Sequence, residues 1–184
     1  MSHYTVAVIH EGGVDIEELL APYDEEIRVE PYIHLTKAEV VEQAKLSWPS
    51  LKGASDDECW EEYVISWDIS PEFIDEEKNI YSTYNPKAKW DWYVVGGRFS
   101  DFLGEKIGLW ENEVRLSDID KTKKFVTYAV VTPDGEWHAP GEVGWFGTST
   151  DTKEEYNKWA ENYWTDFIET MDQELYLTIV DCHI

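Results

Sequence analysis

Residues 84–99 gather the side chains of this sequence that are best suited to binding an aromatic anion. An arginine offers a planar guanidinium that matches a carboxylate or a phosphate. Two lysines add positive charge, and two tryptophans offer rings on which a ligand ring can stack. The stretch therefore predicts a pocket for a nucleotide-like anion, in a small-molecule binding protein or an enzyme. The candidate ligand-binding residues are Lys87, Lys89, Trp90, Trp92 and Arg98.

The same stretch also fits a structural interpretation. Its aromatic residues would form a core strand, Gly96 and Gly97 would form a bulge, and Arg98 would pair with one of the 39 acids of the chain. The two glycines are not a P-loop, because they lack its spacing and the Lys-Ser or Lys-Thr that follows it. Both interpretations stay open at the level of sequence.

Other residue types with catalytic potential show no decisive pattern. The five histidines do not form HExxH or paired Cys-His spacing, and no GxSxG serine motif occurs. Cys182 and His183 are adjacent, so in a strand their side chains would point to opposite faces and could not form a Cys-His pair. A contact of Cys182 with His10 or His138 in the folded chain stays open. We expect two free thiols, no metal, no cofactor and a binding protein rather than an enzyme.

The net charge of −24 is the strongest functional indication, since 39 acids stand against 15 bases. It disfavours direct binding of nucleic acid, whose phosphates would be repelled, and of an anionic membrane surface. Residues 53–77 hold ten acids and no Lys or Arg, and residues 151–174 hold eight acids and two lysines. Helices in these ranges would display rows of carboxylates that imitate the phosphates of a duplex. The predicted partner-binding residues are Asp56, Asp57, Glu58, Glu61, Glu62, Glu154, Glu155 and Glu161.

The alternative for this acidity is solubility alone, without a partner. No apolar run approaches the length of a membrane span, and the first residues do not resemble a secretory leader. With 27 aromatic residues the chain is unlike a disordered acidic tail. We therefore expect a folded cytoplasmic protein.

The predicted elements favour one α+β domain over residues 1–184, with a mostly antiparallel sheet and helices packed on one face. A ferredoxin-like arrangement is one candidate topology. Strands are predicted at residues 4–10, 27–33 (an edge strand containing Pro31), 125–131, 136–138 and 175–182. Helices are predicted at residues 16–21, at 36–48 after a capping box formed by Thr36 and Glu39, from 56 onward, and at 153–171.

Four segments carry a resemblance to a known family: MSHYTVAV at the start, NPKAKWDWYVVGGR at residues 85–98, GWFG at 144–147 and TIVDCH at 178–183. Together they resemble a family of uncharacterised small acidic proteins from phages and mobile elements. The resemblance implies a bacterial host cytoplasm. Combined with the acidity, it predicts an anti-CRISPR-like inhibitor that mimics DNA and binds a basic, nucleic-acid-handling host protein.

Overall fold

The chain folds into two compact units in a computed structural model that describes residues 2–143 and 148–184. Unit 1 comprises Met1–Ile27 and Asn85–Ile184, and unit 2 comprises Arg28–Tyr84. This differs from the single domain expected over residues 1–184, because unit 2 has a hydrophobic core of its own. The GWFG segment of the resemblance, residues 144–147, lies outside the described residues.

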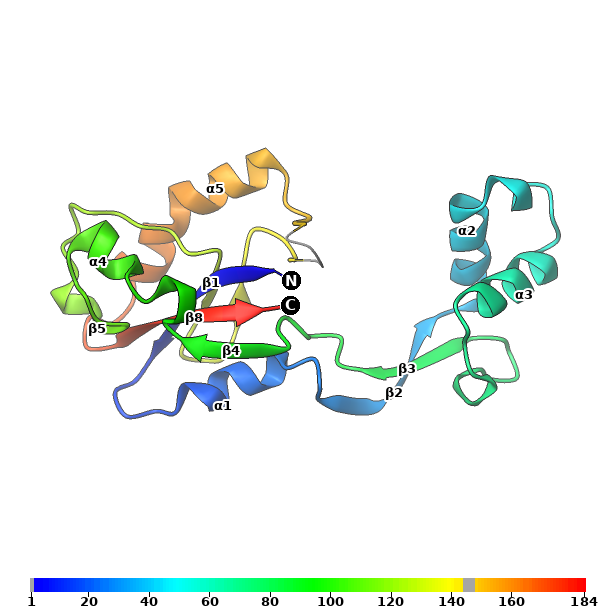
Figure 1. The fold of residues 1–184 in the computed structure, drawn as a ribbon, viewed down its shortest axis with the longest axis horizontal. Helices are drawn as coiled ribbons and strands as arrows, with labels where there is room; N and C mark the ends of the chain where they lie inside the picture. The colour runs from blue at the N-terminus through cyan, green and yellow to red at the C-terminus, as the bar shows by residue number, and fades with distance from the viewer. Residues whose placement is uncertain (1, 144–147) are drawn as a thin grey trace. The chain divides into compact units, whose positions relative to one another are not determined.

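Unit 1 is built on a sheet in the order β4-β8-β1-β6-β7, with β5 also pairing with β8 (Figure 1). The central strands β1 and β8 pair antiparallel over eight residues, whereas β1 and β6 are parallel. Both central strands are almost wholly buried, as their apolar sequences predict. The strands are β1 His3–His10, β4 Trp92–Val95, β5 Glu113–Arg115, β6 Ala129–Val131, β7 Trp137–His138 and β8 Tyr176–His183.

Both faces of this sheet are covered. Helices α4 (Phe102–Ile107) and α5 (Lys153–Trp164), with a π-helical turn at Thr165–Glu169, pack on the face of Ala7, Ile9 and Ile179. The short helix α1 (Ile16–Leu20) packs on the opposite face, against Val6, Val8 and Val180. The α+β class and the mostly antiparallel sheet are confirmed. The expected one-sided packing holds for α4 and α5 but not for α1, whose apolar residues cover the second face.

The topology differs from the ferredoxin-like candidate. The elements β1, α1, β6, β7, α5 and β8 do follow one another in the β-α-β-β-α-β order of that fold. Here, however, the first strand of the hairpin, β6, lies beside β1, and the second, β7, forms the edge. In a ferredoxin-like sheet the two hairpin strands occupy the opposite places. The tight turn at Pro133, Asp134 and Gly135 makes β7 the neighbour of β6, and the pairing of β6 with β1 leaves β7 at the end of the strand order.

Unit 2 consists of a two-stranded antiparallel ribbon and two helices. Among the described residues, strand β2 (Arg28–Leu35) pairs with β3 (Ile80–Tyr84) alone, which agrees with the edge strand expected around Pro31. Helices α2 (Lys37–Ser47) and α3 (Asp56–Ser66) each begin with a capping box, and their buried residues form the core of the unit. Short 3-10 turns along the chain are η1 Ala21–Tyr23, η2 Pro49–Leu51, η3 Pro71–Phe73, η4 Gly97–Phe99 and η5 Leu116–Asp118.

Candidate functional site

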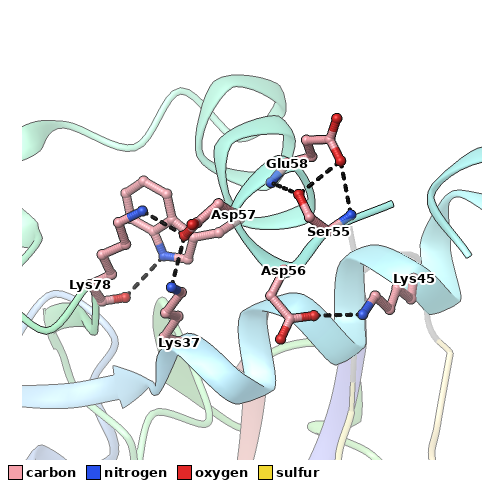
Figure 2. Close-up of polar contacts among 8 residues, drawn as sticks. Lys37, Lys45, Ser55, Asp56, Asp57, Glu58 and Lys78 are labelled. Carbon is pink, nitrogen blue, oxygen red and sulfur yellow. Dashed lines mark hydrogen bonds and ion pairs between the residues drawn. The ribbon is translucent and has the colours of Figure 1, made fainter. Parts of the chain in front are cut away.

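The acids at the start of α3 have partners within unit 2 (Figure 2). The Asp56 carboxylate lies 2.7 Å from the ammonium group of Lys45. The Asp57 carboxylate lies 2.8 Å from the ammonium groups of both Lys37 and Lys78. These ion pairs join α3 to α2 and to the turn that precedes β3, so they serve the fold of the unit.

These contacts also shift the pKa values of acids at the start of α3. Hydrogen bonds from Lys37 and then Lys78 lower the pKa of Asp57 to about 2. The pKa of Glu58 is also lowered, because its carboxylate accepts from the backbone N–H and the hydroxyl of Ser55 in the capping box. The first three predicted partner-binding acids are therefore engaged by neighbours in the fold.

The acids that follow face solvent without cationic partners. Residues 61–77, here called the acidic segment, contain no Lys or Arg. Six of their acids are exposed and form no ion pair with any described residue, although Glu62 accepts a hydrogen bond from Ser66. These six are Glu61, Glu62, Asp68, Glu72, Glu76 and Glu77. The excess negative charge of unit 2 thus gathers at the second half of α3 and the turns after it.

Large apolar side chains are exposed on the acidic segment. Ile65 is 74% exposed and Trp67 is 64% exposed. The Trp67 ring lies 6.2 Å from the ring of Tyr63, which is buried and bonded through its hydroxyl to Gln43. An exposed indole resting on a fixed ring is typical of a residue that anchors an interface.

Of the three predicted partner-binding acids on α5, one is used by the fold and two are exposed. Glu155 closes the capping box with Thr152 and is occupied there. Glu154 and Glu161 are exposed and form no ion pair with the described residues, but Lys153 and Lys158 lie among them on the helix. The expected row of carboxylates is therefore interrupted by positive charge on α5.

The five residues predicted to bind an anion do not converge on one pocket. Trp90 is buried, and its indole N–H donates to the carbonyl of Leu20. Lys87 and Lys89 line a cleft of about 300 Å³ together with Tyr23, Trp137, Glu136 and Glu142. The Lys89 ammonium is bound to Glu142 at 2.6 Å. The two lysines of this cleft thus share its wall with two carboxylates, one of which already binds Lys89.

Trp92 begins β4 at the end of the sheet, whereas Arg98 lies in the turn after the last residue of β4, and neither residue lines that cleft. Trp92 is 42% exposed and stacks on the imidazole of His183 at 4.9 Å. The backbone N–H of Arg98 donates to Asp181, while its exposed guanidinium forms no ion pair within the part of the chain that the structure describes. The expected pairing of Arg98 with an acid is thus not observed among those residues.

Two histidine–aspartate pairs at this end of the sheet were missed at the level of sequence. The Nδ1 atom of His3 lies 2.8 Å from Asp181, and the Nδ1 atom of His183 lies 2.7 Å from Asp91. The only local signal was a histidine near each end of the chain, and the strand register that pairs His3 with His183 was unknown. Cys182 is buried on the other face, against Tyr4 and Val180, so the adjacent Cys-His pair does not form.

The described residues contain neither a metal-binding cluster nor a membrane-spanning helix. No group of three or more His, Cys, Asp or Glu side chains in residues 2–143 and 148–184 is placed to hold a metal ion. No helix within those ranges is long and apolar enough to cross a membrane. No family model, curated protein or solved structure matches the chain.

Proposed function

We propose that this protein is an acidic binding protein that occupies a basic surface of a nucleic-acid-handling protein in a bacterial host, in the manner of an anti-CRISPR inhibitor. The observation that carries the proposal is the acidic segment of unit 2. Its six exposed acids have no cationic partner among the described residues. Carboxylates left in this state are available to the lysines and arginines of another protein.

The physical basis is competition for positive charge. A surface that binds nucleic acid displays lysines and arginines to phosphates. Carboxylates in a fixed array attract the same groups, and complementary fields speed the encounter. Because the attraction is between exposed charges, added salt weakens it. A protein of net charge −24 would be repelled by the nucleic acid itself and would bind only its protein partner.

The ion pairs within unit 2 favour some of the predicted acids over others as contacts for the proposed partner. Asp56 and Asp57 hold α3 against neighbouring lysines, whereas Glu61 and Glu62 on the same helix are exposed. The contact surface therefore centres on the acidic segment, with Trp67 as an apolar anchor. Glu154 and Glu161 on α5 would form a separate, weaker surface.

The test uses two variants with the same change in net charge. One replaces Glu61, Glu62, Glu72 and Glu76 by Gln. The other replaces four exposed acids of unit 1 by Gln, namely Glu17, Glu18, Glu105 and Glu111. Tagged protein would capture its partner from host lysate at low and at high salt, and the purified partner would then be tested for competition with DNA.

We expect salt-sensitive binding that displaces DNA from the partner and is weakened by the first variant much more than by the second. Equal weakening by both variants would mean that net charge alone is responsible. A captured partner that has no affinity for nucleic acid would contradict the proposal.

A further inference from the structure

A cluster of rings occupies the end of the sheet where β4, β8 and β1 meet. His3 lies directly across from His183, and His183 lies directly across from Trp92. The ring centroids of the two histidines are 4.9 Å apart, and that of Trp92 lies 5.3 Å from His3. Since residues paired across neighbouring strands share a face, these three rings form one surface. We call His3, Asp91, Trp92, Asp181 and His183 the histidine cluster.

The positions of the cluster residues are fixed by carboxylates. Asp181 is 1% exposed, and one of its oxygens accepts from His3 at 2.8 Å. Its other oxygen accepts from the backbone N–H of Arg98 at 3.0 Å. Asp91 fixes the ring of His183 through Nδ1 in the same way. Because each Nδ1 is occupied by a carboxylate, the Nε2 atoms are the ring nitrogens left for a ligand.

Two side chains near these histidines, Arg98 and Trp92, keep surface that is accessible to a ligand. Arg98 follows Gly96 and Gly97 in the turn after β4, and its guanidinium is exposed without an ion pair among the described residues. This is unexpected in a chain with 39 acids. Trp92 has one face against His183 yet remains 42% exposed, which leaves indole surface for a second planar ring.

The geometry points to a binding site at the histidine cluster and Arg98 for a small planar ring that carries one anionic group. The indole of Trp92 would stack on the ring, the guanidinium of Arg98 would bind the anion, and an imidazole Nε2 would hydrogen-bond a polar edge of the ligand. Each carboxylate of the cluster already pairs with one imidazole. The backbone N–H of Arg98 donates to Asp181 of the cluster. Its guanidinium forms no ion pair with any described residue, so it is the cation left to bind the anionic group. This site is independent of the acidic segment.

The experiment is a titration followed by NMR of the histidine and tryptophan ring signals. The probes are adenosine monophosphate and benzoate, which share a planar ring and an anion, with adenosine and inorganic phosphate as the two half-ligands. The variants are Arg98→Ala and Trp92→Ala, and the matched control is Lys87→Ala, which removes an exposed cation from the cleft beside Trp137. Arg98 and Lys87 are both exposed, so these substitutions leave the fold intact.

We expect one or both ring-bearing anions to shift the signals of Trp92, His3 and His183 and to bind more tightly than either half-ligand. Arg98→Ala should weaken binding on the order of tenfold, Trp92→Ala should weaken it as well, and Lys87→Ala should not. Binding of the monophosphate alone would identify a nucleotide, and binding of benzoate alone an aromatic acid. The inference is overturned if neither probe shifts these signals at millimolar concentration, if adenosine binds as well as its monophosphate, or if Arg98→Ala has no effect.

Discussion

The imidazole of His3 in the first strand lies 2.8 Å from the carboxylate of Asp181 in the last strand. The two residues are 178 positions apart in the sequence. The same carboxylate accepts the backbone N–H of Arg98, so one buried side chain joins β1, β8 and the turn after β4. Removal of this buried carboxylate would leave two partly buried donors without their acceptor.

Asp181→Ala is therefore expected to destabilise unit 1 by about 2–4 kcal/mol, because buried donors lose their partner. Denaturant unfolding followed by tryptophan fluorescence measures this loss. The matched variant is Asp101→Ala, at an exposed acid whose side chain caps nothing. Equal stability of the two variants would show that the Asp181 contacts contribute little.

Gly97→Ala is expected to destabilise unit 1 by displacing the Asp181 carboxylate. Gly97 has a φ of +53°, and an added Cβ would lie 2.6 Å from atoms of Asp181. Strain and the close approach together should cost about 1–3 kcal/mol of the free energy of unfolding. Gly53→Ala is the control, since nothing lies within 4 Å of its added Cβ and its φ is not positive. A neutral Gly97→Ala would contradict the close packing seen here.

Unit 2 is expected to lose stability in acid through Asp57. Its pKa falls from 3.8 to about 2 on folding, because Lys37 and Lys78 bind the ionised form. A lowered folded pKa stabilises the protein above the unfolded pKa, and this contribution disappears as the pH falls from 3.8 towards 2.

Carbon NMR of the Asp57 carboxyl should thus give a midpoint of about 2. The midpoint should move up in the double variant Lys37→Gln, Lys78→Gln. Glu61→Gln, at an exposed acid without an ion pair, is the control and should leave the Asp57 midpoint in place. A wild-type midpoint near 3.8 would mean that the two lysines do not hold the carboxylate in solution.

Cys182 is expected to resist alkylation in the folded protein. Burial, and secondarily the neighbouring Asp181 charge, raises the pKa of its thiol, so little thiolate forms. Mass spectrometry after iodoacetamide treatment at about pH 8 should show Cys182 unmodified in the native state and labelled in denaturant. Rapid native labelling of Cys182 would contradict its burial against Tyr4 and Val180.

Features set by neighbours in the chain were predictable from sequence. The capping box of Thr36 and Glu39 forms where it was expected, because its two partners are three residues apart. The turn at residues 133–135 joins β6 to β7, as Pro-Asp-Gly between apolar segments indicates. The predicted strand at 125–131 is shorter than expected, since β6 begins only at Ala129.

Features set by distant residues were not predictable. Asp57 meets lysines 20 and 21 positions away, so its occupation could not be read from the charge pattern. Trp90 and Trp92 are two residues apart, yet one donates a hydrogen bond in the core and the other stacks on His183 at the surface. The separation into two units also depends on long-range pairing of β2 with β3. A single sequence shows none of these contacts.

The two points where the chain leaves and re-enters unit 1 are tied together within that unit. The side-chain amide of Asn85 donates to the carbonyls of Pro22 and Asp24, and the backbone N–H of Glu25 donates to the carbonyl of Trp90. These hydrogen bonds join the two parts of unit 1 that lie before and after residues 28–84 in the sequence. Unit 2 is in effect an insertion between Ile27 and Asn85, so its residues can be changed while the sheet of unit 1 keeps its register. Substitutions in the acidic segment should therefore leave the histidine cluster undisturbed.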